Sequence, residues 1–361
     1  MNAARHFSDS AWELLGRYIA DNKYLYDVSV SSCGVTDSRM KALMSGLTRS
    51  RALMDLDLSE NEISVDGIEA MVPFLKKCPN LSELDMDGNN DLKTDGFELL
   101  VDSLRGIDTI QKLRVERCGV SSIMALERNA LPSLRNLDLG GNIIALIPSF
   151  DKFPKLESLY LDRNEIDPDG YHAIAELLRK RESSLTLLSL CSTGMGDREA
   201  NIIAKSLQSN TKLTTLEMRG RNCFSRKGLI SFIKLLNDIS SIDNTVSSNH
   251  TILTLGFPER ARLGHHQIMR YIDFAINMNR IHAGIADAAG KAKVVGSQLN
   301  TNKRLKLSRL QGLTQGAGHI FSQIESFLLP DVLALTGRKH GLNDFFRMFL
   351  STLPHLMALR Q

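Results

Sequence analysis

Apolar side chains recur along the first two-thirds of the chain in the order Leu-x-x-Leu-x-Leu-x-x-Asn-x-Ile. One copy is made of Leu53, Leu56, Leu58, Asn61 and Ile63. Successive side chains of a strand point to opposite faces, so the Leu-x-Leu alternation buries both leucines and exposes the residues between them. Each copy therefore predicts one short strand with one buried face and one exposed face.

The copies return at intervals that predict a stack of similar units. The first apolar residue of each copy falls at Leu25, Leu53, Leu81, Ile110, Leu134, Leu156, Leu185 and Leu213. The spacings are 28, 28, 29, 24, 22, 29 and 28 residues. In the long units, apolar pairs four residues apart, such as Met71 and Leu75, predict a helix with one apolar face.

The two units between Ile110 and Leu156 are too short to contain a full helix. They also contain Pro132, Pro148 and Pro154, and proline breaks a helix interior because it removes a donor and clashes with the preceding turn. We expect 3₁₀ turns or loops in place of helices there, with a local change of curvature.

In the pattern and length of its units, the chain resembles leucine-rich repeat proteins of the ribonuclease-inhibitor-like class over about residues 10–240. The resemblance implies an α/β solenoid shaped like a horseshoe, with a parallel sheet on the concave face and helices on the convex face. The asparagine of each unit, replaced by Cys33, Cys118 or Thr193 in three of them, is expected to bond backbone groups of the adjoining turn. A reactive thiol at Cys33 or Cys118 is the weaker alternative, because burial raises a thiol pKa.

Both ends of such an array need covering, because an open solenoid exposes its core. At the first end, Ala11, Leu15 and Ile19 share one helical face. They predict a capping helix over residues 9–21, with Ser8 or Asp9 as its N-cap.

At the second end, counting on from the last marker places Ile242 at the start of a strand, with Thr245 and Ser247 where leucines belong. This register predicts a decayed, polar last repeat. The predicted divisions of the chain are residues 1–22 for the capping helix, 23–240 for the repeats, 241–257 for the decayed repeat and 258–361 for a helical segment.

Helical spacing replaces the repeat after Pro258. It predicts helices over about residues 268–276, 305–313 and 320–328, from residue 330, and over 345–353. This segment resembles the helical tail of some lineage-expanded leucine-rich repeat proteins of unicellular eukaryotes. Two roles stay open for it, a cap on the solenoid or an adaptor surface for a larger assembly.

Composition adds a mild charge asymmetry. The formal net charge is +3, with 14 Lys and Arg against 6 Asp and Glu over residues 258–361. This bias is too small to demand nucleic acid as a partner.

Five cysteines without close pairs favour reduced thiols, and hence the cytoplasm or the nucleus. No stretch approaches the roughly 18 apolar residues of a membrane span. The oligomeric state is left open.

The sequence offers little for catalysis, cofactors or metals. Between Gly284 and Gly290 lie five residues where a phosphate-binding loop needs four, and Ala292 stands where that motif has Ser or Thr. The adjacent His265 and His266 have no further ligand at metal-binding spacing. We therefore expect no enzyme activity, no cofactor and no metal site.

The candidate binding residues lie on the exposed face of the predicted sheet. Neighbouring strands are about 5 Å apart, so acids at matching positions repel one another unless a partner or a nearby cation compensates them. Lys112 and Arg114 are the nearest cations in the sequence. A merely solvated polar face is the alternative to a binding surface. The candidates are Asp55, Asp57, Glu83, Asp85, Asp87, Lys112, Arg114, Asp138, Tyr160, Asp162 and Arg219.

These observations predict a non-enzymatic scaffold that binds a protein, with a basic surface or segment, on the concave face of the array. One alternative is a GTPase-activating or other regulatory accessory protein, since Ran GTPase-activating proteins share this repeat class. Arg114, Arg163 and Arg219 are the arginines that could act on a phosphate in that case. The other alternative is an adaptor subunit of a signalling or ubiquitin-ligase complex.

Overall fold

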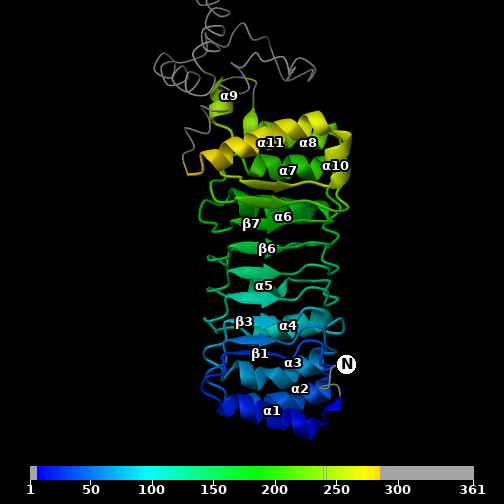
Figure 1. Cartoon of the computed structure of the whole chain (residues 1–361), viewed down its shortest axis with the longest axis vertical. Coiled ribbons are helices and arrows are strands. Elements are labelled where there is room, and N and C mark those ends of the chain that lie inside the picture. Colours follow the sequence, from blue (N-terminus) through cyan, green and yellow to red (C-terminus); the bar gives the residue numbers. More distant parts are fainter. Residues whose placement is uncertain (1–5, 239, 241, 285–361) are drawn as a thin grey trace, which may run out of the picture.

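Nine short parallel strands form one sheet in the computed structural model, which describes residues 6–238, 240 and 242–284. Their order in the sheet is their order in the chain. Each unit therefore adds one strand beside the last, and Figure 1 shows the strands stacked along the long axis of the molecule. The strands are β1 (Asp27–Ser29), β2 (Asp55–Asp57), β3 (Glu83–Asp85), β4 (Lys112–Arg114), β5 (Asn136–Asp138), β6 (Ser158–Tyr160), β7 (Leu187–Ser189), β8 (Thr215–Glu217) and β9 (Thr254–Gly256).

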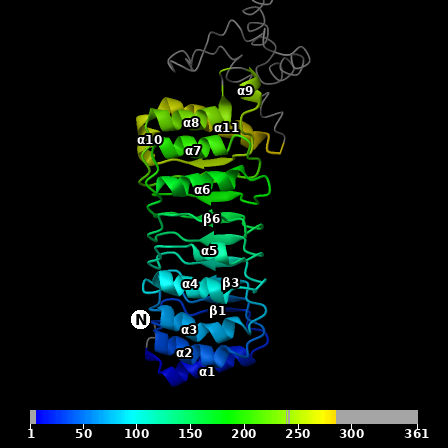
Figure 2. The ribbon, with the colours of Figure 1, turned by 180° about the vertical axis from the view of Figure 1, so that it is seen from behind.

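The helices form a second stack that runs beside the sheet (Figures 1 and 2). Contacts between successive helices, from α1 to α4 and from α6 to α8, link this stack from unit to unit. The described helices are α1 (Asp9–Asp21), α2 (Asp37–Leu47), α3 (Val65–Leu75), α4 (Lys93–Ser103), α5 (Ala125–Arg128), α6 (Pro168–Arg179), α7 (Asp197–Ser206), α8 (Arg226–Asn237), α9 (Ile242–Val246), α10 (Glu259–Gly264) and α11 (His266–Ile281).

The two short units lack a full helix, as predicted from their length and their prolines. The first of them has only α5, which is four residues long. The second joins β5 to β6 through turns and loops, and Figure 2 shows the gap that this leaves in the helix stack. The convex side of the solenoid is therefore thinner in the middle than at either end.

Buried leucines at the middle of each strand fix the register of the sheet. Leu56 pairs with Leu84 and Leu84 with Leu113, and all three are at most 1 % exposed. Because side chains alternate along a strand, this register places the polar residues on either side of the leucines in straight columns on the opposite face. The prediction of a leucine-rich repeat sheet with these columns is confirmed.

Each repeat asparagine holds two neighbouring units together. The Oδ1 atom of Asn142 accepts hydrogen bonds from the backbone N–H groups of Cys118 and Val120, at 3.0 and 3.1 Å. Its Nδ2 atom donates to the carbonyl oxygens of Val115 and Leu139, at 2.7 and 3.0 Å. These bonds satisfy backbone groups that the turn leaves without strand or helix partners. The predicted structural role of the asparagine position is confirmed.

The predicted helix over residues 9–21 is present as α1, and it covers the first end of the array. Ser8 caps it, because its Oγ atom accepts the N–H of Ala11 at 3.3 Å. Helix α1 packs closely on α2 where two glycines meet. A Cβ atom on Gly46 would lie 2.7 Å from the carbonyl carbon of Gly16, so the absence of both side chains allows this close approach.

The register predicted for the last repeat is wrong. Residues that were expected to begin a strand at Ile242 form the short helix α9 instead, and the strand β9 lies at Thr254–Gly256. The position equivalent to Leu213 is taken by Ile252, which is fully buried. An insertion before β9 lengthens the connection, and Asn249 re-establishes the repeat by accepting the N–H of Ile252 at 3.1 Å.

Helix α11 follows β9 and packs against α8, so it closes the second end of the described array (Figure 1). Its Asn279 side chain donates to the carbonyl oxygens of Ile252 and Asn249, at 2.8 and 3.3 Å. The helix predicted over about residues 268–276 lies within α11. The helices predicted after residue 300 fall outside the described residues, and the predicted division of the chain into segments stays a prediction.

Candidate functional site

The exposed face of the sheet brings most of the candidate residues together. The first and last residues of β2 through β5 are half-buried on this face. In register, Asp57 lies beside Asp85, Asp85 beside Arg114, and Arg114 beside Asp138. Tyr160 extends the same column on β6. Eight of the eleven candidates therefore form one continuous surface across five strands, β2 to β6.

Arg114 lies at the centre of this surface and forms ion pairs with Asp85 and Asp87 of the preceding repeat. One Nη atom lies 3.2 Å from Oδ2 of Asp85, and the Nε atom lies 3.9 Å from Oδ2 of Asp87. Burial by itself would lower the pKa of Arg114, but the carboxylates of Asp85 and Asp87 outweigh it and raise that pKa. Much of the predicted acidic patch on β3 is thus neutralised within the protein.

The acids on β1 and β2 are less well compensated. Asp55 stands in register between Asp27 and Glu83. Burial and the charges of Glu83 and Asp27 raise its pKa, against a weaker opposing effect of Lys112. Lys112 itself makes an ion pair with Glu83 at 2.9 Å. We call Asp27, Asp55 and Glu83 the acidic ladder.

Asp57 is stabilised as a carboxylate by hydroxyl groups. Its Oδ2 atom accepts the hydroxyl of Ser29 at 2.7 Å, and its Oδ1 atom accepts the hydroxyl and the N–H of Ser59, at 2.6 and 2.9 Å. Burial opposes ionisation of Asp57, but these hydrogen bonds outweigh it and lower the pKa of Asp57. Asp57 therefore carries a full negative charge beside the acidic ladder.

Two further candidates serve the sheet itself. The Oδ1 atom of Asp87 accepts the backbone N–H of Glu116 at 2.6 Å, and Oδ1 of Asp162 accepts the backbone N–H of Cys191 at the same distance. Asp87 is only 13 % exposed at its side chain. Burial, together with the charges of Asp85 and Asp138, raises the pKa of Asp87 to about 7. Both carboxylates tie one repeat to the next.

An apolar rim, at positions outside the predicted candidates, borders the acidic ladder. It consists of Tyr24, Tyr26 and Met54, which are 83 %, 51 % and 46 % exposed. The backbone N–H groups of Met54 and Asp55 both donate to the carbonyl oxygen of Tyr26, which places the rim directly before β1 and β2. The signal was present in the sequence, since Tyr26 and Met54 immediately precede the first residue of a strand.

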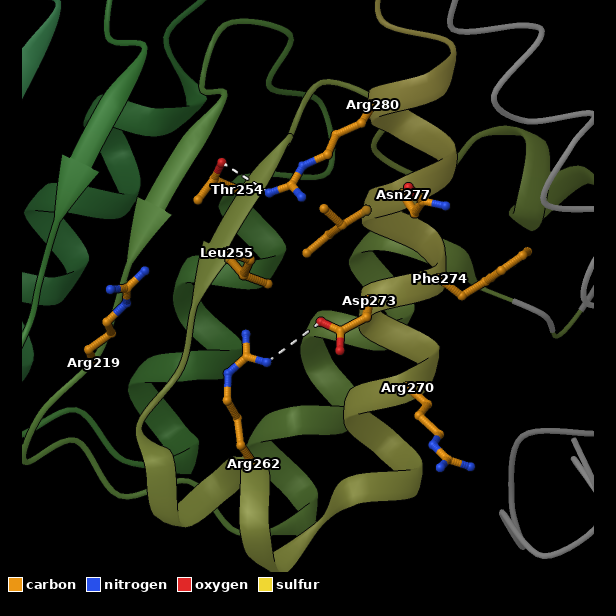
Figure 3. A pocket seen from close by; sticks show the side chains of 10 residues that line it. Arg219, Thr254, Leu255, Arg262, Arg270, Asp273, Phe274, Asn277 and Arg280 are labelled. Carbon is orange, nitrogen blue, oxygen red and sulfur yellow. Dashed lines mark hydrogen bonds and ion pairs between the residues drawn. The ribbon is translucent and has the colours of Figure 1, made fainter.

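Arg219 does not join the acidic surface. It follows β8 at the far end of the sheet, where its Nε atom lies 2.9 Å from Oε2 of Glu217. A pocket between β9 and α11 includes it among its lining residues (Figure 3). Arg219 thus belongs to a pocket with several arginines at the other end of the sheet, away from the acidic ladder.

The described part of the chain gives three further findings. Within residues 6–238, 240 and 242–284, no three His, Cys, Asp or Glu side chains are placed to hold a metal ion together. The helices of the same residues include none with the length and apolar content to cross a bilayer. Burial raises the pKa of the Cys118 thiol to about 12, which disfavours the reactive thiolate.

The comparisons with known proteins match this architecture. A family model described as a leucine-rich repeat matches residues 49–72. A human NACHT, LRR and PYD domains-containing protein 14 is 26 % identical over 210 residues, which cover 58 % of this chain and 18 % of that protein. The mouse ribonuclease inhibitor is 28 % identical over 185 residues, covering 47 % of this chain and 40 % of the inhibitor.

A third relative is the Rho GTPase-activating protein gacW of Dictyostelium discoideum. It is 27 % identical over 186 residues, which cover 46 % of this chain and 16 % of that protein. The chain thus spans less than half the length of each of these three relatives. With its parallel strands, its alternating helices and its repeat asparagines, the chain is a leucine-rich repeat protein of the ribonuclease-inhibitor-like class.

Proposed function

We propose that the chain is a non-enzymatic interaction scaffold, and that the N-terminal part of its exposed sheet face binds a protein through a basic segment. The observation that carries this proposal is the acidic ladder, in which Asp55 has a carboxylate on the strand at each side. Among the described residues, Lys112, paired with Glu83, is the one nearby cation. These carboxylates repel one another in the free protein. A cationic side chain from a partner would relieve that repulsion.

The apolar rim supports the same surface. Tyrosine and methionine are enriched at protein interfaces, where aromatic side chains provide large contact areas at low entropic cost. Tyr26 and Met54 lie directly beside the acidic ladder. A basic segment that also carries apolar side chains would contact the rim and the ladder together.

The internal ion pairs determine which acidic residues are suitable for a test of this proposal. Asp85 is held by Arg114, so its substitution would break an internal ion pair as well as any contact with a partner. Asp27 and Asp55 give a cleaner test. The double variant Asp27→Asn/Asp55→Asn lowers the negative charge of the ladder by two without removing an ion pair that holds the sheet.

The experiment compares native-lysate cross-linking and quantitative mass spectrometry for three forms of the chain. We expect the double variant to lose a defined set of cross-linked proteins, with residues of that set cross-linked near the rim in the unchanged protein. The control Glu69→Gln/Asp108→Asn makes the same change of charge at exposed positions away from the sheet face and should keep the set. Equal capture by all forms at low and high salt would contradict the proposal.

The GTPase-activating alternative stays a prediction. Of the arginines considered for it, Arg114 is engaged by Asp85 and Asp87, and Arg163 lies 3.9 Å from Glu116 with 67 % of its side chain exposed. A GTP-hydrolysis assay with a panel of small GTPases tests this function. The adaptor alternative depends on the segment after residue 258, most of which falls outside the described residues.

A further inference from the structure

A pocket of about 550 Å³ lies at the second end of the sheet, between β9 and α11. Four arginines contribute to its lining, with Asp273 as the one acid among the lining residues that the structure describes. Figure 3 shows Arg262 and Arg280 reaching into the space between β9 and α11, with Arg219 across from them beside β8. The pocket is therefore a concave site with an excess of positive charge.

The placement of these arginines follows from helical spacing and from the end of the repeat. Arg270, Asp273, Asn277 and Arg280 recur every three or four residues of α11, so they form one stripe of that helix. The opposite stripe, which includes Ile272, packs into the core. Since β9 ends the described sheet, this polar stripe stands beside a strand edge where a further repeat would otherwise pack.

Internal ion pairs compensate the arginines only in part. Arg262 approaches Asp273 at 3.9 Å, a long contact between side chains that are 46 % and 54 % exposed. Arg219 is paired with Glu217 at 2.9 Å but remains 64 % exposed. Arg280 donates to the carbonyl oxygen of Leu253 and to the hydroxyl of Thr254, neither of which is charged. Among the described residues, and counting Glu217 with those of the lining, four arginines stand against two acids, which leaves an excess of two positive charges.

Gly256 leaves room for the ion pair between Glu217 and Arg219. A Cβ atom at Gly256 would lie 1.8 Å from Oε2 of Glu217 and 3.0 Å from Nε of Arg219. The Glu217–Arg219 pair therefore occupies the space above a residue that has no side chain. A side chain at this position would displace the ion pair.

We propose that this pocket binds a phosphomonoester group, as carried by a phosphorylated side chain or by a free phosphate ester. The planar fork of a guanidinium matches two oxygen atoms of a phosphate. A phosphomonoester carries a charge of about −1.5 to −2 at neutral pH, which matches the excess of the site better than a single carboxylate does. Thr254 and Asn277 provide further polar groups at its wall. The site is separate from the acidic ladder, so neither proposal depends on the other.

Fluorescence anisotropy with the full chain tests the proposal, using a labelled phosphoserine peptide, its serine form and its glutamate form. We expect the phosphopeptide to bind at least about tenfold more tightly than either, because charge-assisted hydrogen bonds to a phosphate are worth more than one factor of ten. Inorganic phosphate and free phosphoserine serve as competitors. Displacement by both shows that the phosphomonoester is the recognised group, and displacement by phosphoserine alone shows that its carrier is recognised as well.

The variant Arg219→Gln/Arg262→Gln should weaken phosphopeptide binding at least about tenfold. It leaves Arg280 in its contact with the strand. The control Lys76→Gln/Arg105→Gln removes two positive charges from exposed positions in the N-terminal half and should leave binding unchanged. Asp273→Asn removes the acid that competes for Arg262 and should tighten binding, an effect that a purely structural role for these residues would not produce.

Three results would overturn the proposal. The first is equal affinity for the three peptides. The second is an equal loss of binding in the pocket variant and in the control. The third is binding of a single-stranded oligonucleotide that neither the phosphopeptide nor inorganic phosphate displaces, which would assign the arginines to a phosphodiester backbone.

Discussion

Replacing Asn142 by alanine should destabilise the middle of the array more than any exposed substitution on the sheet. Asn142 is 6 % exposed, and its side chain bonds the N–H groups of Cys118 and Val120 and the carbonyl of Val115. The alanine variant leaves these three buried groups without the partners that the structure gives them. At about 1–3 kcal/mol for each unsatisfied group, with some relief from local relaxation, we expect a loss of about 4 kcal/mol in the free energy of unfolding.

Amide hydrogen exchange and urea denaturation measure this effect. In a repeat array the damage should be local, because each unit contacts only its neighbours. Exchange should accelerate at the amides of Cys118 and Val120. It should stay slow at the amide of Ile144, whose acceptor is the side chain of Asn164 at 3.0 Å.

The control is Asn136→Ala, which removes a half-buried asparagine from the start of β5 in the same unit. It should change the free energy of unfolding by less than about 0.5 kcal/mol. If Asn142→Ala lost less than about 1 kcal/mol and kept the amides of Cys118 and Val120 protected, the argument that buried backbone groups need this side chain would be refuted.

Two further predictions concern pH and close packing. Because the folded-state pKa of Asp87 is raised to about 7, the folded chain binds more protons than the unfolded chain between about pH 4 and pH 7, so the free energy of unfolding should fall as pH rises through this range. Asp87→Asn should flatten that slope in urea titrations at pH 5, 6, 7 and 8, and an unchanged slope would exclude Asp87 as its source. Gly46→Ala would place a Cβ atom 2.5 Å from the backbone nitrogen of Arg17. The free energy of unfolding should fall by about 1–3 kcal/mol, and amide exchange in α1 should become faster. Exchange in α1 no faster than in the exposed control Ser45→Ala would contradict the close contact.

Much of the fold was predictable because burial leaves a local imprint on the sequence. The Leu-x-Leu alternation placed β1 to β8 at the observed residues, since a strand can bury only every second side chain. The asparagine role followed from the need to satisfy turn backbone groups. The capping helix followed from its apolar spacing, although its buried residues are Trp12, Gly16 and Ile19, while the expected Ala11 and Leu15 are half-buried. Each of these inferences uses residues close together in the chain.

The last strand shows where this reasoning failed. Counting a constant repeat length from Leu213 misplaced the strand at Ile242, because a regular interval contains no information about an insertion. The apolar pattern that ends at Phe257 marked the true position, with Ile252 and Leu255 buried. The repeat accommodates this insertion because the added residues form α9 between α8 and β9. The pairing of Leu216 with Leu255 preserves the strand register.

The sequence predicted which residues share the exposed face of the sheet, but it did not predict how their charges pair. The sequence placed Asp85, Asp87 and Arg114 on neighbouring strands, but only the structure shows that the arginine clamps both acids. The structure also shows that Arg219 lies away from the acidic surface, in the lining of the pocket beside α11. Side-chain ion pairs depend on distances of a few ångströms between units, which the spacing of a repeat does not specify.

The sequence by itself determined the repeat, the sheet and the residues that its exposed face presents, because alternation and helical spacing are local consequences of burying apolar side chains. The tertiary structure alone decided which acids of the exposed face form ion pairs, and which arginines meet around the pocket at Arg262. Those outcomes depend on how strands about 5 Å apart and a closing helix bring charges from different units together. Electrostatic energy falls with distance, and the distances exist only in the folded chain.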